Sequence, residues 1–272
     1  MLPNPIIPGL PIHMYGVMIA VGILACFGVI TFYGKRMKLA ESFIDFIFFN
    51  GIAAIFIGFL SAALFQAVYD FIENPAAGFR ISGSITFIGG LIGGAAAFLI
   101  VWFILRRRLK GSITDILTLA PCAITVAHAF GRVGCFFAGC CHGIATDCFL
   151  GVKFPGLSVR VHPTQLYEAA FLFLLFALLS YLLLRRGFRH NMSVYLVAYG
   201  IFRFLNEYLR GDHRGEFVGG ISPSQFWSLF MILLGVGVFF LVRYLDAKNA
   251  PRTPEIATVT DTIAPTEESE NL

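Results

Sequence analysis

Four polar residues near the end of one apolar stretch have types and a spacing that suit anion binding. Tyr199, Arg203, Glu207 and Arg210 follow one another at intervals of four, four and three residues. On an α-helix this spacing places all four side chains on one face. Arg203 and Glu207 can neutralise each other, which lowers the free-energy cost of burying them, whereas Arg210 has no evident partner on that helix. The pattern predicts an anion-binding site, with a purely structural ion pair as the alternative.

The segment from His128 to Gly143 carries a second set of polar side chains. Its sequence, HAFGRVGCFFAGCCHG, is too apolar for an ordinary solvated loop, and its glycine content favours irregular backbone over a regular helix. Irregular backbone at membrane depth is tolerated where protein buries it or where it lines a wet cavity. Arg132 lies between two glycines, so the backbone can approach a phosphate closely while the guanidinium group makes bidentate hydrogen bonds.

The next motif, HPTQLYE at residues 162–168, predicts the start of a further helix. Glu168 would then lie just inside the membrane, where an unpaired carboxylate is costly. We therefore expect Glu168 to hold one of the arginines.

Cysteines are concentrated in the same part of the chain. In an oxidising compartment, neighbouring cysteines can form disulfides. Together with His142 they could instead bind zinc, although the spacing is not that of a standard zinc finger, or they could simply pack as small apolar residues. These three interpretations stay open for Cys135, Cys140, Cys141 and Cys148, whereas Cys26 and Cys122 lie within apolar stretches and are expected to pack there.

Composition indicates that these motifs belong to an integral membrane protein. Hydrophobic residues make up 57% of the chain and charged residues only 13%, whereas soluble domains carry roughly 25% charged residues. A transmembrane helix needs about 20 consecutive apolar residues. We expect an all-α integral membrane protein with seven transmembrane helices, at about 13–34, 43–70, 85–105, 113–130, 165–185, 192–209 and 222–243.

Basic residues predict how these helices are oriented. Runs of Lys and Arg follow the first, third, fifth and seventh stretches, and the alternate loops are poorer in both. By the positive-inside rule the N-terminus is outside and the C-terminus is cytoplasmic, which places both arginine-containing motifs toward the outer leaflet. Residues 249–272 are rich in Thr, Pro, Ala and Glu and predict a disordered cytoplasmic tail after a transmembrane domain of residues 1–248. No basic patch is interleaved with aromatic residues, so nucleic acid is not an expected partner.

Several motifs occur in the order in which the prolipoprotein diacylglyceryl transferases carry them, and the chain resembles that family along nearly all of its membrane region. These are bacterial inner-membrane enzymes that begin lipoprotein maturation. The resembling segments are Tyr15-Gly16, Gly89-Gly90-Leu91-Ile92-Gly93, Gly131-Arg132-Val133-Gly134, the 162–168 motif, the Tyr199–Arg210 pattern, and Ile221-Ser222 with Gln225.

The resemblance implies transfer of the diacylglyceryl group of phosphatidylglycerol to the lipobox cysteine thiol of a preprolipoprotein, with release of glycerol phosphate. It implies membrane lipid and signal peptides as partners, a multi-pass location in the inner membrane, and neither a cofactor nor a metal. Catalytic roles are expected for Arg132, Arg203, Glu207, Arg210 and His142. Substrate-binding roles are expected for Arg132, Tyr15, Gly89, Gly90, His162, Gln165, Glu168 and Tyr199.

The chain departs from the family pattern at the residues that would handle the thiol proton. The family usually has a His, proposed as the base, immediately before the glycine pair, and this chain has Ile88. Two Asn and a Glu that usually follow the arginine signature are replaced by Cys135, Ala138 and Cys140. The sequence leaves open how the thiol is activated: His128, His142 or His162 could act as the base, or the arginines could stabilise a thiolate.

Two other functions are compatible with the sequence. One is a membrane thiol oxidoreductase that uses the cysteines between Cys135 and Cys148. The other is a non-catalytic lipid-binding paralogue or a transporter, which the absence of the expected histidine allows.

Overall fold

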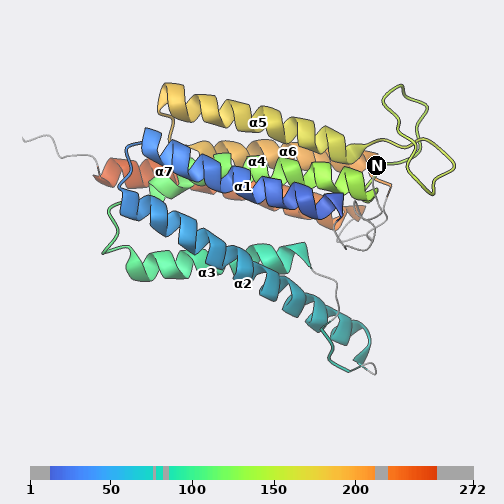
Figure 1. Cartoon of the computed structure of the whole chain (residues 1–272), viewed down its shortest axis with the longest axis horizontal. Helices are drawn as coiled ribbons and strands as arrows, with labels where there is room; N and C mark the ends of the chain where they lie inside the picture. Colours follow the sequence, from blue (N-terminus) through green and yellow to red (C-terminus); the bar gives the residue numbers. More distant parts are fainter. Residues whose placement is uncertain (1–12, 76–77, 82–85, 212–219, 250–272) are drawn as a thin grey trace, which may run out of the picture.

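The computed structural model describes residues 13–75, 78–81, 86–211 and 220–249. Seven α-helices account for most of this part of the chain, and successive helices run in opposite directions along the long axis of the molecule (Figure 1). They are α1 (Met14–Arg36), α2 (Glu41–Glu73), α3 (Phe87–Leu105), α4 (Ile113–Ala138), α5 (Thr164–Arg186), α6 (Asn191–Asn206) and α7 (Pro223–Asn249). Each predicted apolar stretch is therefore a helix.

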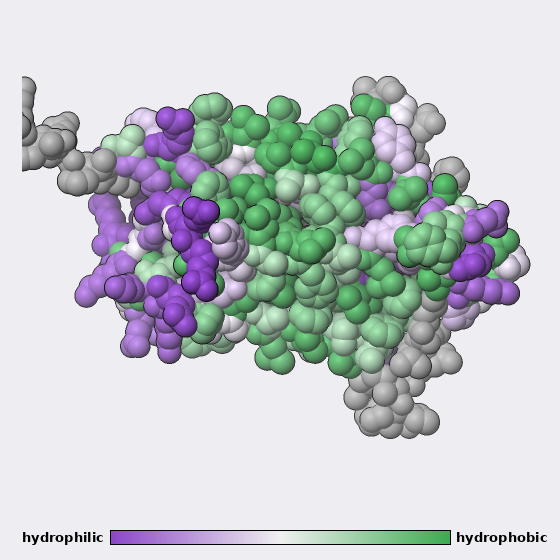
Figure 2. All heavy atoms as spheres, turned by 90° about the horizontal axis from the view of Figure 1, so that it is seen from above, coloured by the Kyte–Doolittle hydropathy of each residue, from purple (hydrophilic) through white to green (hydrophobic). Residues whose placement is uncertain are grey.

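Five of the described helices, α1, α2, α4, α5 and α7, are long and apolar enough to cross a membrane. Helix α3 contributes a shorter apolar segment, Gly89–Leu105, and α6 has 16 residues. Figure 2 shows an apolar belt between two hydrophilic ends of the molecule. Such a belt is expected where helices satisfy their own backbone hydrogen bonds and meet lipid with apolar side chains.

Basic side chains gather at one end of the bundle. Lys35 and Arg36 end α1, Arg185 and Arg186 end α5, and Lys248 lies in the last turn of α7. Because odd-numbered helices all run the same way, these ends lie together, at the left of Figure 1. The predicted site residues of α4, α5 and α6 lie toward the opposite end.

The helices form a main bundle with a hairpin beside it. Helix α4 packs against α1, α5 and α6, and α6 packs against α7, while α3 packs chiefly against α2 (Figure 1). Small residues allow the α2–α3 contact, since a Cβ on Gly90 would lie 3.2 Å from the Cβ of Ala62. The Asn50 side chain in α2 also donates a hydrogen bond to the Phe98 carbonyl oxygen (3.1 Å).

Helix α4 corrects one prediction, because the arginine-containing segment is regular helix rather than irregular backbone. A capping box between Ser112 and Asp115 begins α4, and Gly139 ends it in a left-handed conformation (φ 73°). Gly134 allows α1 to approach, since a Cβ there would lie 3.2 Å from the side chains of Tyr15 and Met18. In a membrane the helix satisfies every backbone group, and glycine favours close packing of helices. Gly134 therefore indicated a helix contact and Gly139 a helix end, and neither indicated a loop at Arg132.

Irregular backbone begins only after α4 and connects to the end of α6. Residues 139–163 form isolated β-bridges between Ala145 and Val161, between Val152 and Val161, and between Gly143 and Arg210. This connection therefore fixes the backbone of Arg210 from outside the helix bundle. The predicted tail lies almost wholly outside the described residues, because α7 continues to Asn249.

Candidate functional site

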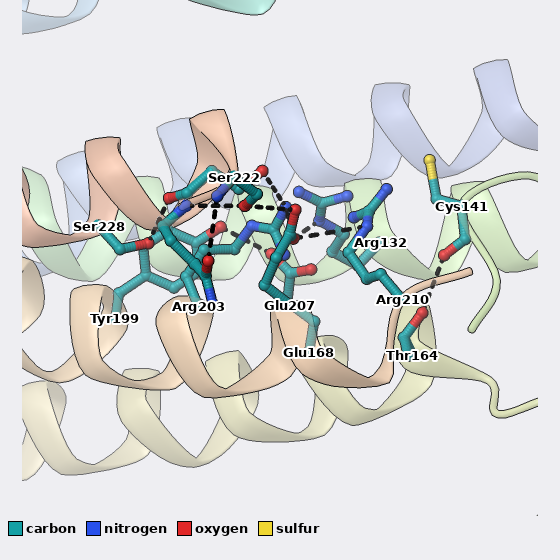
Figure 3. Close-up of polar contacts among 12 residues, drawn as sticks. Arg132, Cys141, Thr164, Glu168, Tyr199, Arg203, Glu207, Arg210, Ser222 and Ser228 are labelled. Atoms are coloured by element: carbon teal, nitrogen blue, oxygen red, sulfur yellow. Dashed lines mark hydrogen bonds and ion pairs between the residues drawn. The ribbon is translucent and has the colours of Figure 1, made fainter. Parts of the chain in front are cut away.

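Buried ionic and hydroxyl side chains from four helices form a row at the end of the bundle opposite the basic residues (Figure 3). The row draws on α4, α5, α6 and the start of α7, together with the short segment after α6. It contains two carboxylates, and each of them anchors a separate network.

Glu168 anchors the first network and is 1% exposed. Its Oε1 accepts a hydrogen bond from the Tyr199 hydroxyl (2.6 Å) and lies 3.0 Å from Nε of Arg132. His128, one helical turn before Arg132, places its Nε2 3.6 Å from the same oxygen and 3.3 Å from the Arg132 Nε. The structure thus pairs Glu168 with an arginine, as expected, and identifies it as Arg132.

Glu207 anchors the second network and contacts two arginines. Its Oε2 lies 2.8 Å from Nη2 of Arg203 and 3.7 Å from Nε of Arg210, and its Oε1 accepts a hydrogen bond from Ser222 (3.1 Å). Arg203 also donates to the Ser224 hydroxyl (2.9 Å). Within the described residues, its buried Nη1 has no hydrogen-bond partner.

Arg210 corrects two predictions. Helix α6 ends at Asn206 and is followed by the 3-10 helix η2 (Glu207–Leu209), after which Arg210 is extended (φ −81°, ψ 142°). The four residues therefore do not share one α-helix, because the chain leaves the helix to form the bridge to Gly143. Arg210 also has a partner, because its Nε lies near the Glu207 carboxylate. The Arg210 side chain is 3% exposed.

Guanidinium groups outnumber carboxylates among the described residues of the row. Those of Arg132, Arg203 and Arg210 accompany the carboxylates of Glu168 and Glu207. Guanidinium groups that converge in this way are suited to charge-assisted hydrogen bonds with an anionic ligand such as a phosphate.

Tyr15 of α1 lies at the same end of the bundle. It packs on Gly134 of α4 and lies within electrostatic reach of Arg132 and of the thiols of Cys135, Cys140 and Cys141. The structure thus brings a predicted substrate-binding residue to the arginine row from a separate helix.

Gly89 and Gly90 lie elsewhere, in the contact between α3 and α2. A Cβ on Gly89 would lie 2.5 Å from the Cβ of Phe65, and the Gly89 carbonyl accepts a hydrogen bond from Ser61 (2.8 Å). These contacts account for both glycines as packing residues. The neighbouring position 88 has no described side chain.

Residues of the 162–168 motif hold the backbone beyond α4. Gln165 donates to the carbonyl oxygen of Cys140, and Thr164 donates to that of Cys141 (2.9 Å). The His162 Nδ1 lies 3.1 Å from the Tyr167 hydroxyl. The observed contacts of Gln165 position the cysteines.

His142 belongs to the same turn. Its Nδ1 lies 3.2 Å from the neighbouring Gly143 carbonyl oxygen, and its ring packs on Phe154 with 5.4 Å between centroids. Its backbone carbonyl accepts a hydrogen bond from the Gly211 amide (3.5 Å). These contacts tie His142 to the Arg210 segment.

Three thiols form a cluster beside the arginine row. The sulfurs of Cys135, Cys140 and Cys141 all lie within 4.8 Å of one another, and Cys148 does not belong to the cluster. All three thiols are free. Hydrogen bonds from Cys135 and Cys140, followed by the charges of Arg210 and Arg132, lower the pKa of the Cys141 thiol from its ordinary value.

Sequence reasoning named His128 as one of several possible thiol activators and Ser222 as part of a family-like motif, but it predicted the carboxylate contacts of neither. It did not name Ser224, which accepts a hydrogen bond from Arg203. The four-residue interval between His128 and Arg132 was a usable signal, because it places both on one helix face. The serines gave no comparable signal, since their approach to α6 depends on how α7 packs.

The described residues also line a cavity of about 670 Å³ at the basic end of the bundle, between Phe32, Asp115, Leu183 and Arg189. It lies at the end opposite the arginine row, and none of the predicted site residues lines it.

Comparison with known proteins is consistent with the geometry of the row. The family model for prolipoprotein diacylglyceryl transferase matches residues 5–241. The phosphatidylglycerol–prolipoprotein diacylglyceryl transferase of Clostridium tetani is 36% identical over 245 residues, which cover 87% of this chain and 95% of that protein. The corresponding transferase 2 of Clostridium perfringens is 32% identical, covering 89% and 95%. A transferase of the same name from Xylella fastidiosa is 29% identical, covering 90% and 94%.

Proposed function

The chain belongs to the prolipoprotein diacylglyceryl transferase family, and on that premise we propose that it transfers the diacylglyceryl group of phosphatidylglycerol to the lipobox cysteine of a preprolipoprotein. In this reaction the cysteine sulfur attacks the glycerol carbon next to the phosphate, a thioether forms, and glycerol phosphate leaves. The observation that carries the proposal is the convergence of the guanidinium groups of Arg132, Arg203 and Arg210 in one row.

The charge of the row fits both the substrate and the leaving group. Phosphatidylglycerol has one negative charge on its phosphodiester, which the guanidinium groups of Arg132, Arg203 and Arg210 can bind. When the carbon–oxygen bond breaks, further negative charge develops on the phosphate. Prepositioned guanidinium groups stabilise that developing charge at a site that excludes water.

We assign the roles of the site residues from their contacts. Arg132 and Arg210 bind the phosphate and head group, because they lie at the end of the row nearest the cysteine turn (Figure 3). Glu168 and Tyr199 hold Arg132 in place. In the same way, Glu207 orients Arg210 and Arg203.

The remaining site residues are assigned more peripheral roles. Tyr15 positions polar atoms of the lipid, while His142, His162 and Gln165 support the turn beside it. Gly89 and Gly90 act indirectly, through the α2–α3 packing.

The proposed topology has seven membrane spans, with the N-terminus outside and the C-terminus cytoplasmic in the bacterial inner membrane. The collection of basic residues at the end of the bundle formed by the last turns of α1, α5 and α7 supports it. The arginine row then faces the outer leaflet, where phosphatidylglycerol and an exported signal peptide meet. Residues 1–248 form the transferase domain, and the remainder is a cytoplasmic tail.

The direct test is transfer of a radiolabelled diacylglyceryl group to a lipobox peptide by the purified full chain. We expect phosphatidylglycerol to serve as donor and phosphatidylethanolamine to fail. Arg132→Ala should lower kcat/KM by about 10²–10³-fold, the typical loss for one donor to a developing anion. Arg186→Ala, an exposed arginine at the opposite end of the bundle, is the matched control and should retain parental activity.

Two results would contradict the proposal. Binding of phosphatidylglycerol without turnover, by a parent protein of normal helicity, would indicate a non-catalytic lipid-binding protein. Exchange of thiols and disulfides with membrane quinone, without diacylglyceryl transfer, would indicate an oxidoreductase.

A further inference from the structure

The three clustered thiols have the spacing of a metal site. Cys135 lies in the last turn of α4, and Cys140 and Cys141 lie just beyond the helix end. Their sulfurs all lie within 4.8 Å of one another. Thiolates bound tetrahedrally to one zinc ion lie roughly 3.8 Å apart, because each zinc–sulfur bond is about 2.3 Å long. Small side-chain rotations would therefore bring all three sulfurs to one ion.

The backbone that forms the cluster is held in an unusual conformation. Gly139 has a φ of 73°, and Cys141, which lacks the freedom of glycine, has a φ of 61°. This turn folds the chain back, so that the Cys140 amide donates to the Cys135 carbonyl oxygen (3.2 Å). Gln165 and Thr164 of α5 then fix the Cys140 and Cys141 carbonyls. Strained residues persist only where the surrounding structure holds them, and they are frequent at functional sites.

The surroundings of the cluster suit a thiolate-bound metal ion. Three thiolates and one divalent ion carry a net negative charge, and Arg210 and Arg132 lie within electrostatic reach of Cys141. Cys140 is exposed, which gives an ion access from outside the bundle, while the other two thiols are partly buried. Figure 3 places Cys141 just beyond the two arginines at the end of the polar row.

We propose that Cys135, Cys140 and Cys141 bind one Zn²⁺ ion whose fourth coordination position is open to the thiol of the substrate. Three protein ligands with one open position are typical of catalytic zinc, whereas structural sites have four protein ligands. Arginine stays protonated and cannot accept the thiol proton. A metal ion beside the arginines would instead make the coordinated thiol more acidic, so that it binds as the thiolate and its proton passes to water.

The proposed step extends the function assigned above and depends on it. The lipobox thiol binds zinc and releases its proton to water. A sulfur electron pair then forms the bond to the glycerol carbon, and the bond from that carbon to the phosphate oxygen breaks. Its electron pair leaves with glycerol phosphate beside the arginines, the thioether dissociates from zinc, and the ion keeps its three protein ligands.

The first test measures metal binding independently of activity. The full chain is purified without chelator under reducing conditions, and its zinc content is measured by mass spectrometry. We expect about one zinc per chain, and Co²⁺ in its place should give thiolate-to-metal charge transfer with the strong visible bands of tetrahedral coordination. Cys141→Ser should lower the zinc content at least tenfold, whereas Cys148→Ser, outside the cluster, should keep it.

The second test links the ion to transfer. Removal of zinc by a chelator should lower diacylglyceryl transfer at least tenfold, and added Zn²⁺ or Co²⁺ should restore it. The cobalt spectrum should also change when a lipobox peptide binds, and a peptide with serine at the lipobox position should leave it unchanged. This spectral change comes from the parent protein, so it does not depend on whether a cysteine variant folds.

The outcomes separate this inference from the proposed function. Two results would overturn the zinc site and leave the proposed transferase activity intact. One is transfer at the full rate by the parent protein without zinc. The other is transfer by parent protein whose cluster contains a disulfide when it is isolated under non-reducing conditions. If the parent protein binds zinc in the cluster but transfers no diacylglyceryl group, the metal site is supported. That result would contradict the proposed transferase activity and the catalytic role of zinc.

Discussion

At the scale of single residues, the site depends on carboxylates that each hold more than one cation or hydroxyl donor. Glu168 of α5 contacts Arg132 and His128 of α4 and Tyr199 of α6, and it is 1% exposed. Removing one partner of a buried ion pair leaves the other charge buried without compensation. The resulting loss of folding stability exceeds the net stabilisation that the intact pair provides.

Glu168→Gln should therefore destabilise the protein as well as inactivate it. We expect a loss of about 3–5 kcal/mol in the free energy of unfolding, because Arg132 remains buried without its counter-charge. Denaturant unfolding in detergent micelles, followed by circular dichroism, measures the change. Glu41→Gln, at the exposed start of α2, is the control and should leave stability within experimental error. Equal stability of the two variants would show that Glu168 does not balance Arg132.

Arg210→Lys tests whether the site needs the guanidinium shape or only its charge. Lysine keeps the positive charge but loses the planar fork that binds phosphate with two hydrogen bonds. We expect kcat/KM to fall by roughly one to two orders of magnitude, less than for Arg210→Ala, because one charge-assisted hydrogen bond is lost. Steady-state kinetics with phosphatidylglycerol vesicles provide the measurement, and parental kinetics in Arg210→Lys would argue against direct phosphate contact.

At the scale of helices, the position of Tyr15 depends on how closely α1 approaches α4. Gly134 makes this approach possible, since a Cβ there would lie 3.2 Å from both Tyr15 and Met18. Close helix contacts through small residues are the main source of helix association in a membrane, where lipid is as apolar as the side chains.

Gly134→Val should separate α1 from α4 and displace Tyr15. Overpacking of this kind lowers the free energy of unfolding by about 1–3 kcal/mol. The transfer activity should fall by more than the loss of folded protein accounts for. Gly28→Val is the matched control, because Gly28 of α1 is exposed and a Cβ added to it would have no atom within 4 Å. The measurements are the thermal unfolding and the transfer activity of both variants. If the two variants have the same unfolding temperature and the same activity, the α1 contact does not position Tyr15.

At the scale of the whole molecule, the distribution of charge separates the two ends. Basic residues end α1, α5 and α7 at one side of the apolar belt, and the arginine row with its thiols lies toward the other. In the proposed topology, the row would face the outer leaflet, where a negatively charged phospholipid and an exported thiol could both reach it.

Topology reporters provide the whole-molecule prediction. A fluorescent protein fused after Asn249 should fluoresce, and alkaline phosphatase at the same position should be inactive, because the positive-inside rule predicts that the basic end lies in the cytoplasm. Alkaline phosphatase inserted after Lys153, in the connection between α4 and α5, should be active. The reverse pattern would place the arginine row at the cytoplasmic face and contradict the proposed route of the substrates.

The amino-acid sequence by itself determined the seven helices, because apolar length is a property of consecutive residues. It also singled out Arg132 and Glu168, since a charge within an apolar stretch is costly wherever the helix packs. Expected irregular backbone around Gly131 and Gly134 was wrong, because sequence alone does not show that a helix with glycines fits against a neighbour.

Only the tertiary structure decided which of these residues meet. Glu168 and Arg132 belong to different helices, and their 3.0 Å contact depends on the rotation and depth of α4 and α5. The contact between Arg203 and Glu207, by contrast, was expected from their spacing along one helix. The three thiols converge because Gly139 and Cys141 turn the backbone through left-handed conformations, which apolar periodicity does not reveal. The Glu168–Arg132 pair arises from packing between distant segments, so hydropathy and spacing along one segment do not contain it.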